Sequence, residues 1–242
     1  MYKRQICFIL ASLLVSFILT KRETKKQVAS VDLKKLTNLS NSSALILIPA
    51  VDKEGKGVMT WLEVKIVNGT GKTLVNIDNL LFWQDTQNSI RVAKRVAQNI
   101  TGIDLSNYDL IYSLHANASA VGGESAGAAI TLATIAAITR KKLKPGVVIT
   151  GTINHDGTIG PVAGIVAKAK AAKQFNASLF LVPLSQSREV EYETRKHCEK
   201  FGWTEFCTVE QVPKVVNVAD EAGIKVREVE SVQEAMQYFF EE

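Results

Sequence analysis

One short stretch constrains this chain more than any other. It reads Gly122-Gly-Glu-Ser-Ala-Gly-Ala128 and is followed by a run of Ala, Ile, Leu and Thr. The glycines remove side-chain bulk around Ser125, and the run predicts a nearly apolar helix from Ser125 to about Arg140. A hydroxyl is therefore expected at a helix N-terminus, where free backbone N–H groups and the helix dipole would stabilise an anionic oxygen. Serine is also a common N-cap, so the stretch alone leaves both roles open.

The charge of the chain is concentrated at its start. The 242 residues carry a formal net charge of +5, and residues 1 to 26 account for all of it, with six basic side chains against Glu23. The remainder is neutral, so no basic face is expected and we predict no nucleic-acid partner. The length suits one large domain or two small ones.

The basic residues flank an uncharged segment, Gln5 to Thr20, which is typical of a signal peptide or a membrane anchor. As a helix it would span about 24 Å, against roughly 30 Å of hydrocarbon. We expect an uncleaved membrane helix within 1–20, a polar tether over 21–43 and a folded domain over 44–242. Basic residues on the C-terminal flank favour a cytoplasmic domain, whereas several N-glycosylation sequons favour the outside. We lean slightly to the extracytoplasmic side.

The three cysteines leave alternatives open. Cys7 lies in the apolar segment, while Cys198 and Cys207 could form a disulfide in an exported domain or stay reduced inside the cell. His197 is adjacent, but there is no CxxC pair and the three residues make a poor ligand set. We expect no metal and no cofactor.

The hydrophobic pattern predicts an α/β (α+β) layered domain. Two strands, at 44–49 and 58–67, and a third around Val75 and Ile77 suggest an N-terminal antiparallel meander. From residue 85 onward helices (85–100, 125–140, 162–175) alternate with strands (110–116, 147–150, 179–182, 224–229). The last sixty residues are expected to add two further helical stretches and a helix opened by the capping-box pattern Ser231-Val-Gln-Glu234.

Gly123-Glu-Ser-Ala-Gly127 also fits the nucleophile elbow of α/β-hydrolases. That fold needs an acid and a histidine, for which Asp156 and His197 could serve, with His115 and His155 as other bases. The strand at 110–116, however, stops well before Ser125 instead of running into the turn. A Ser-His esterase therefore stays an alternative.

A second route to an active serine is a lysine whose pKa is lowered by burial. The predicted helix at 162–175 carries Lys168, Lys170 and Lys173 among alanines and aliphatic residues. The helical wheel does not choose between them, and each could equally be a solvated surface lysine.

Four motifs in order resemble the proteolytic domain of Lon proteases. They are the glycine-rich stretch at Ser125, then Val148-Ile-Thr-Gly151, then Gly157-Thr-Ile-Gly-Pro-Val-Ala-Gly164 leading into Lys168, and finally Leu181-Val-Pro183. The resemblance implies Ser125 as nucleophile, Lys168 as general base and Thr150 as the hydroxyl that orients the lysine amine. It also implies ring-like homo-oligomers, commonly hexamers.

The chain departs from that family pattern in three ways. Glu124 stands where proline or aspartate is usual, and Thr152 where many members have glutamate. No G-x-x-x-x-G-K-[ST] motif is present, so we expect no ATPase in this chain, and ATP dependence would need a separate ATPase partner. We predict a membrane-tethered serine endopeptidase with a Ser-Lys dyad, acting on unfolded or damaged polypeptides. The alternative of another class is a catalytically weak Lon-type scaffold or peptide-binding module.

Overall fold

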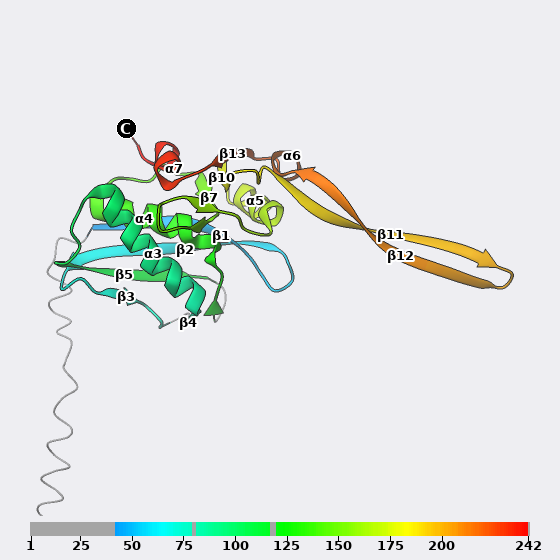
Figure 1. The fold of residues 1–242 in the computed structure, drawn as a ribbon, viewed down its shortest axis with the longest axis horizontal. Coiled ribbons are helices and arrows are strands. Elements are labelled where there is room, and N and C mark those ends of the chain that lie inside the picture. Colours follow the sequence, from blue (N-terminus) through cyan, green and yellow to red (C-terminus); the bar gives the residue numbers. More distant parts are fainter. Residues whose placement is uncertain (1–41, 79–80, 117–119, 242) are drawn as a thin grey trace, which may run out of the picture. The chain divides into compact units, whose positions relative to one another are not determined.

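The computed structural model describes residues 42–78, 81–116 and 120–241 (Figure 1). The predicted membrane segment at 1–20 and almost all of the tether at 21–43 lie outside these residues. Among the helices that are described, none combines the length and apolar character needed to cross a bilayer.

The N-terminal part forms a four-stranded sheet in the order β1-β2-β5-β3. Strands β1 (Ser42–Val51) and β2 (Gly57–Asn68) make the predicted antiparallel hairpin, and β5 (Tyr108–His115) adds to β2 in antiparallel fashion. The expected meander is wrong for its third strand, because β3 (Thr73–Val75) pairs in parallel with β5.

A long-range carboxylate explains this difference. The Asp109 side chain on β5 accepts hydrogen bonds from the backbone N–H groups of Thr70 and Lys72, each at 2.8 Å. The Gly69 N–H also donates to the carbonyl of Asn107. These bonds hold the turn after β2 against the start of β5, so the chain continues alongside β5 instead of returning along β2.

The helices predicted at 85–100 and 125–140 both form, and they are layered on this sheet (Figure 1). Helix α4 (Gly127–Thr139) packs against β1 and β2, and α3 (Gln84–Thr101) packs on α4. Helix α4 is buried almost all round because it has no charged side chain. Its threonine hydroxyls bond to carbonyls four residues back, Thr131 to Gly127 and Thr134 to Ile130, so burying them leaves no unmet donor.

A second, parallel sheet has the order β13-β10-β7. Its strands are β7 (Val147–Ile149), β10 (Leu179–Pro183) and β13 (Lys225–Val229). Helix α5 (Ile165–Gln174) packs against β10 and against the short α6 (Val218–Ala222). The last helix, α7 (Val232–Phe239), begins at the predicted cap, where the Ser231 hydroxyl accepts from the Glu234 N–H.

Two small strand pairs complete the body. Strands β4 (Leu81–Phe82) and β6 (Ala120–Val121) pair in parallel. Strands β8 (Thr152–Ile153) and β9 (Ile159–Gly160) form a hairpin around the predicted turn at 154–157.

Residues 188–217 contradict the predicted pair of helices. They form a long hairpin of β11 (Arg188–Phe201) and β12 (Thr204–Asn217), and α6 is the only helix described between β10 and β13. The hairpin extends from the body as a two-stranded ribbon (Figure 1), exposed on both faces over most of its length. Cys198 and Cys207 lie directly opposite each other near its tip and form a disulfide. A strand exposed on both faces has no burial period in its sequence, which is why the pattern gave no sign of it.

Candidate active site

Ser125 lies in a single 3-10 turn, η1 (Glu124–Ala126), that leads directly into α4. Gly123 precedes the turn with φ of 107°, a conformation that L residues with side chains rarely adopt. Gly127 follows it so close to β8 that a methyl group there would lie 2.6 Å from the Ile153 side chain. The glycines are therefore required by backbone conformation and close packing, and the Ser125 side chain is left partly exposed.

A carboxylate that the sequence analysis did not identify anchors this turn. Asp85, in the first turn of α3, accepts a 2.6 Å hydrogen bond from the Gly123 N–H through one oxygen and another from the Thr86 N–H through the other. The only sequence signal was an acidic residue in the first turn of a predicted helix, a position that helix capping explains equally well.

The backbone of Ser125 is held from the opposite side by the end of β7. Its carbonyl accepts from the Gly151 N–H at 2.9 Å and from the Thr150 hydroxyl at 3.3 Å. The Ala128 N–H donates in return to the Gly151 carbonyl at 3.0 Å. Thr150 is fully buried, so the structure brings Thr150 and Ser125 into direct contact. The predicted role of Thr150 toward the lysine amine stays a prediction.

Lys168 is the buried one of the three lysines on α5. It is 4% exposed, whereas Lys170 and Lys173 are exposed. Burial lowers the pKa of the Lys168 amine to about 8, and the negative charge of Glu189 opposes this by raising it. An amine with a pKa of about 8 is neutral in about a tenth of molecules at pH 7 and in about half of them at pH 8, so it can act as a general base, which an ordinary lysine cannot do at these pH values.

The elements that carry these residues gather around β1. Both η1 and α5 pack against β1, and β7 packs against it as well. The Thr150 N–H donates to the Leu181 carbonyl in β10 at 3.1 Å, and β10 packs against α5. The turn of Ser125 and the helix of Lys168 are thus built into one packed unit.

The residues named for a histidine mechanism are engaged in separate local contacts. The Asp156 carboxylate accepts from the N–H and hydroxyl of Thr158, and these bonds lower its pKa. His197 lies on the exposed ribbon, 3.5 Å from Glu199. His115 stacks on Trp61 with ring centroids 5.3 Å apart, and the His155 ring lies 3.5 Å from the Arg95 guanidinium. None of these described contacts links a histidine to Ser125.

Of the two states that the sequence left open for Cys198 and Cys207, the structure has the disulfide. With their sulfurs bonded to each other, Cys198 and Cys207 have no thiolate to offer a metal. The Glu205 carboxylate lies near the two sulfurs, but His197 and Cys198 are consecutive in β11 and so face opposite sides of the ribbon.

An open hollow of about 450 Å³ adjoins the serine turn. Glu124, the residue before Ser125, forms one wall. Trp83, which occupies the N-cap position of α3, and residues of the first two turns of α3, including Arg91, form the other. Trp83 is well exposed and lies against the backbone of Gly122. The hollow offers an aromatic face and both signs of charge next to the serine.

Comparison with known proteins gives a consistent match. The family described as Lon protease (S16) C-terminal proteolytic domain matches residues 50–221. An archaeal Lon protease of Methanothermobacter thermautotrophicus is 29% identical over 111 residues, which is 43% of this chain and 17% of the relative. An archaeal Lon protease of Thermoplasma volcanium is 30% identical over 123 residues, covering 51% of this chain and 19% of the relative. Lon protease 2 of Bacillus subtilis is 27% identical over 153 residues, covering 58% and 28%. The chain thus spans less than a third of the length of these relatives.

Proposed function

Because this chain belongs to the family of Lon protease (S16) C-terminal proteolytic domains, which are serine peptidases, we propose that it cleaves polypeptides with a dyad of Ser125 and Lys168. The observation that carries the proposal is the burial of Lys168, one lysine among three on its helix, with its pKa lowered to about 8. The partly exposed Ser125 at the start of α4 supports it.

The proposed reaction is acyl transfer in two halves. The neutral amine of Lys168 takes the hydroxyl proton of Ser125 as the oxygen attacks the carbonyl carbon of the scissile bond. The resulting ammonium gives that proton to the leaving amine as the C–N bond breaks, which leaves an acyl ester on Ser125. The amine, neutral again, then takes a proton from water as the water oxygen attacks the acyl ester. The ammonium returns that proton to the Ser125 oxygen as the ester C–O bond breaks, which releases the new carboxyl end and restores both residues.

Two features of the serine turn would assist these steps. Backbone N–H groups near Ser125, at the N-terminal end of α4, are suited to hold the oxyanion of the tetrahedral intermediate. We assign Thr150 the task of orienting the lysine amine, since its oxygen can accept a hydrogen bond while its proton is shared with the Ser125 carbonyl. The hollow between Glu124 and Trp83 is proposed as part of the substrate cleft.

The setting of the enzyme is also a proposal. The apolar segment Gln5 to Thr20 would tether it to a membrane, and the Cys198–Cys207 disulfide supports an extracytoplasmic domain. Its substrates would be unfolded or damaged polypeptides, because the sequence has no P-loop motif with which to drive unfolding. A ring-like homo-oligomer and a separate ATPase partner are further proposals that rest on the family resemblance.

The test uses four variants of the full chain in detergent, with casein and a fluorogenic peptide as substrates. Ser125→Ala and Lys168→Ala should each abolish cleavage, while the matched controls Lys170→Ala and Lys173→Ala should retain it. Unchanged cleavage in Ser125→Ala would overturn the proposal. Ester cleavage that depends on His197 would favour the Ser-His alternative, and peptide binding without cleavage by the unmodified chain would favour the scaffold.

A further inference from the structure

Helix α5, which carries Lys168, begins without a cap of its own. Its N-cap position is Gly164, which has no side chain and adopts φ of 69°. The first backbone N–H groups of a helix have no partner inside the helix and need one from elsewhere. For α5 that partner comes from a different element.

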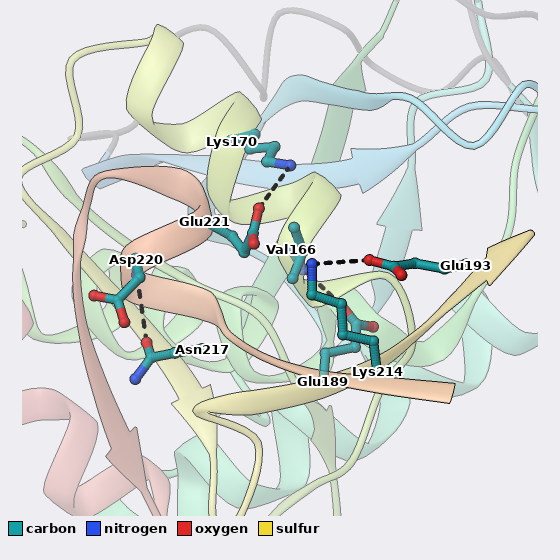
Figure 2. Close-up of polar contacts among 8 residues, drawn as sticks. All are labelled: Val166, Lys170, Glu189, Glu193, Lys214, Asn217, Asp220 and Glu221. Atoms are coloured by element: carbon teal, nitrogen blue, oxygen red, sulfur yellow. Dashed lines mark hydrogen bonds and ion pairs between the residues drawn. The ribbon is translucent and has the colours of Figure 1, made fainter. Parts of the chain in front are cut away.

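Glu189, the second residue of β11, supplies both bonds. One carboxylate oxygen accepts from the Ile165 N–H at 3.1 Å, and the other accepts from the Val166 N–H at 2.7 Å. Figure 2 shows Glu189 beside Val166 at the base of the ribbon. Three residues earlier, the Gln186 side chain accepts from the Val162 N–H and donates to its carbonyl. The segment that leads into the ribbon therefore clamps the chain just before and at the start of α5.

The same carboxylate acts on the catalytic lysine. Its negative charge favours the protonated Lys168 amine and offsets part of the effect of burial. A helix N-terminus also favours a negative charge, so a carboxylate is well suited to the position that Glu189 occupies.

Several other charged groups around α5 are paired with one another. Strands β1 and β10 carry no charged residue. On β2, Lys65 and Glu63 pair at 3.1 Å. On α6, Glu221 pairs with Lys170 at 3.7 Å (Figure 2).

On the ribbon, Lys214 of β12 pairs with Glu193 of β11 at 3.0 Å (Figure 2). Asp220 on α6 lies next to Glu221, and Glu191 follows Glu189 on β11. Lys173 is exposed on α5 itself. Among the charged groups described, Glu189 is the one whose charge acts on the Lys168 amine.

We propose that Glu189 is a positioning residue of the peptidase, which fixes the first turn of α5 and keeps the amine of Lys168 in a charge environment suited to proton transfer. The inference rests on the proposed function and extends it to the ribbon, because Glu189 belongs to β11. A displacement of the ribbon base would then alter the serine–lysine pair without touching either residue.

The test compares Glu189→Gln and Glu189→Asp with the control Glu199→Gln. Glu199 is an exposed carboxylate on the same strand. The readout is the pH profile of kcat/KM for a fluorogenic peptide, whose acidic limb reports the proton affinity of the base in the free enzyme. Removing the charge should lower the pKa of Lys168 and shift this limb to lower pH in Glu189→Gln. Glu189→Asp keeps the charge on a shorter stem and should give a smaller shift, and Glu199→Gln should superimpose on the unmodified chain.

A second readout does not require activity. The Lys168 side chain can be titrated by NMR in ¹³C-lysine-labelled protein, with its signal assigned from Lys168→Met. The pKa of Lys168 should be lowest in Glu189→Gln, intermediate in Glu189→Asp, and the same in Glu199→Gln as in the unmodified chain. Identical Lys168 pKa values in Glu189→Gln and the unmodified chain would overturn the proposal. A fall in thermal stability would not rescue it, because it would report only the weakened cap of α5 and not an action of the Glu189 charge on the amine. If Ser125→Ala were to leave cleavage unchanged while the titration shifted as expected, the proposed function would fail and the action of Glu189 on Lys168 would stand.

Discussion

The hydroxyl of Thr150 donates to the backbone carbonyl of Ser125 at 3.3 Å, and this bond joins the end of β7 to the turn that carries the proposed nucleophile. Thr150 directly follows the last residue of β7 and Ser125 is the middle residue of η1, so we expect a change at Thr150 to move the turn more than the strand. The contact makes Thr150 part of the scaffold of the serine turn as well as a candidate partner of the lysine.

Replacing Thr150 with valine keeps the shape of the side chain but removes its hydroxyl. We expect stability to fall by about 1 kcal/mol, the usual net value of such a bond, and kcat/KM to fall by about tenfold or more as the turn loses its orientation. Urea unfolding and peptide cleavage measure the two effects. The matched control is Thr60→Val, since Thr60 is also buried and donates to a backbone carbonyl, that of Ile48. A similar loss of activity in the control would show that the effect is not specific to the site.

Asp85 should prove essential to the geometry of the serine turn, although it takes no part in the chemistry. In Asp85→Asn one of the two accepting oxygens becomes an NH₂ group, so either the Gly123 N–H or the Thr86 N–H loses its partner. A hydrogen bond to a charged group contributes about 1.5–3 kcal/mol, which makes a loss of kcat of about tenfold or more reasonable. Peptide cleavage measures this loss. The acidic limb of the pH profile should stay in place, because Asp85 does not act on Lys168.

Asp104→Asn is the control for that substitution. Asp104 also accepts from a nearby N–H and hydroxyl, both of Ser106, but on the exposed loop before β5. Wild-type activity in Asp85→Asn would contradict the anchoring role.

The burial of Lys168 should make the protein less stable at neutral pH than it would be with an apolar residue there. The amine has a pKa of about 8 in the folded state and its ordinary value of 10.5 in the unfolded state. Below pH 8 both states are protonated and the full penalty of burying the charge applies. Between pH 8 and 10.5 the unfolded state binds more protons, so the free energy of unfolding rises with pH.

Lys168→Met should therefore stabilise the domain at pH 7 by an amount on the order of 3 kcal/mol, an upper value from the difference in pKa. The gain should shrink as the pH approaches 10.5. Urea unfolding at pH 7, 8.5 and 10 measures both effects, with the exposed Lys173→Met as control. A Lys168→Met variant that is less stable than the unmodified chain at pH 7 would show that burial of the lysine does not lower the free energy of unfolding.

How much of this site the sequence could predict depends on how far apart the interacting residues are. Helices α3 and α4 follow from local apolar spacing and were predicted nearly to their ends. The choice of Lys168 over Lys170 and Lys173 could not come from the helix alone, because it depends on β1 and β2 packing against one side of α5. The motif resemblance supplied that choice instead.

The contacts of Asp85 and Glu189 could not be predicted at all. Each joins two segments more than twenty residues apart through backbone N–H groups. Since nearly every residue has a backbone N–H, the sequence does not indicate which of them a carboxylate will bind. The ribbon was not predicted because it lacks long-range packing. Its strands pack on nothing described beyond their base, so no burial periodicity was imposed on residues 188–217.

The disulfide should stabilise the ribbon and leave the catalytic body unaffected. A two-stranded ribbon is marginally stable in water, and this one exposes Phe201, Trp203 and Phe206 near its tip. The Cys198–Cys207 bond closes a loop of about ten residues, for which the chain-entropy estimate is about 3 kcal/mol. In Cys198→Ser/Cys207→Ser we expect protease cleavage within 195–210 and faster amide exchange there. The melting of the body and the cleavage of a short peptide should stay as in the unmodified chain, because Glu189 caps α5 from the base of the ribbon, nine residues before Cys198. Reduction of the unmodified chain should reproduce the variant. A lowered melting temperature of the body would instead show that the ribbon and the body unfold together.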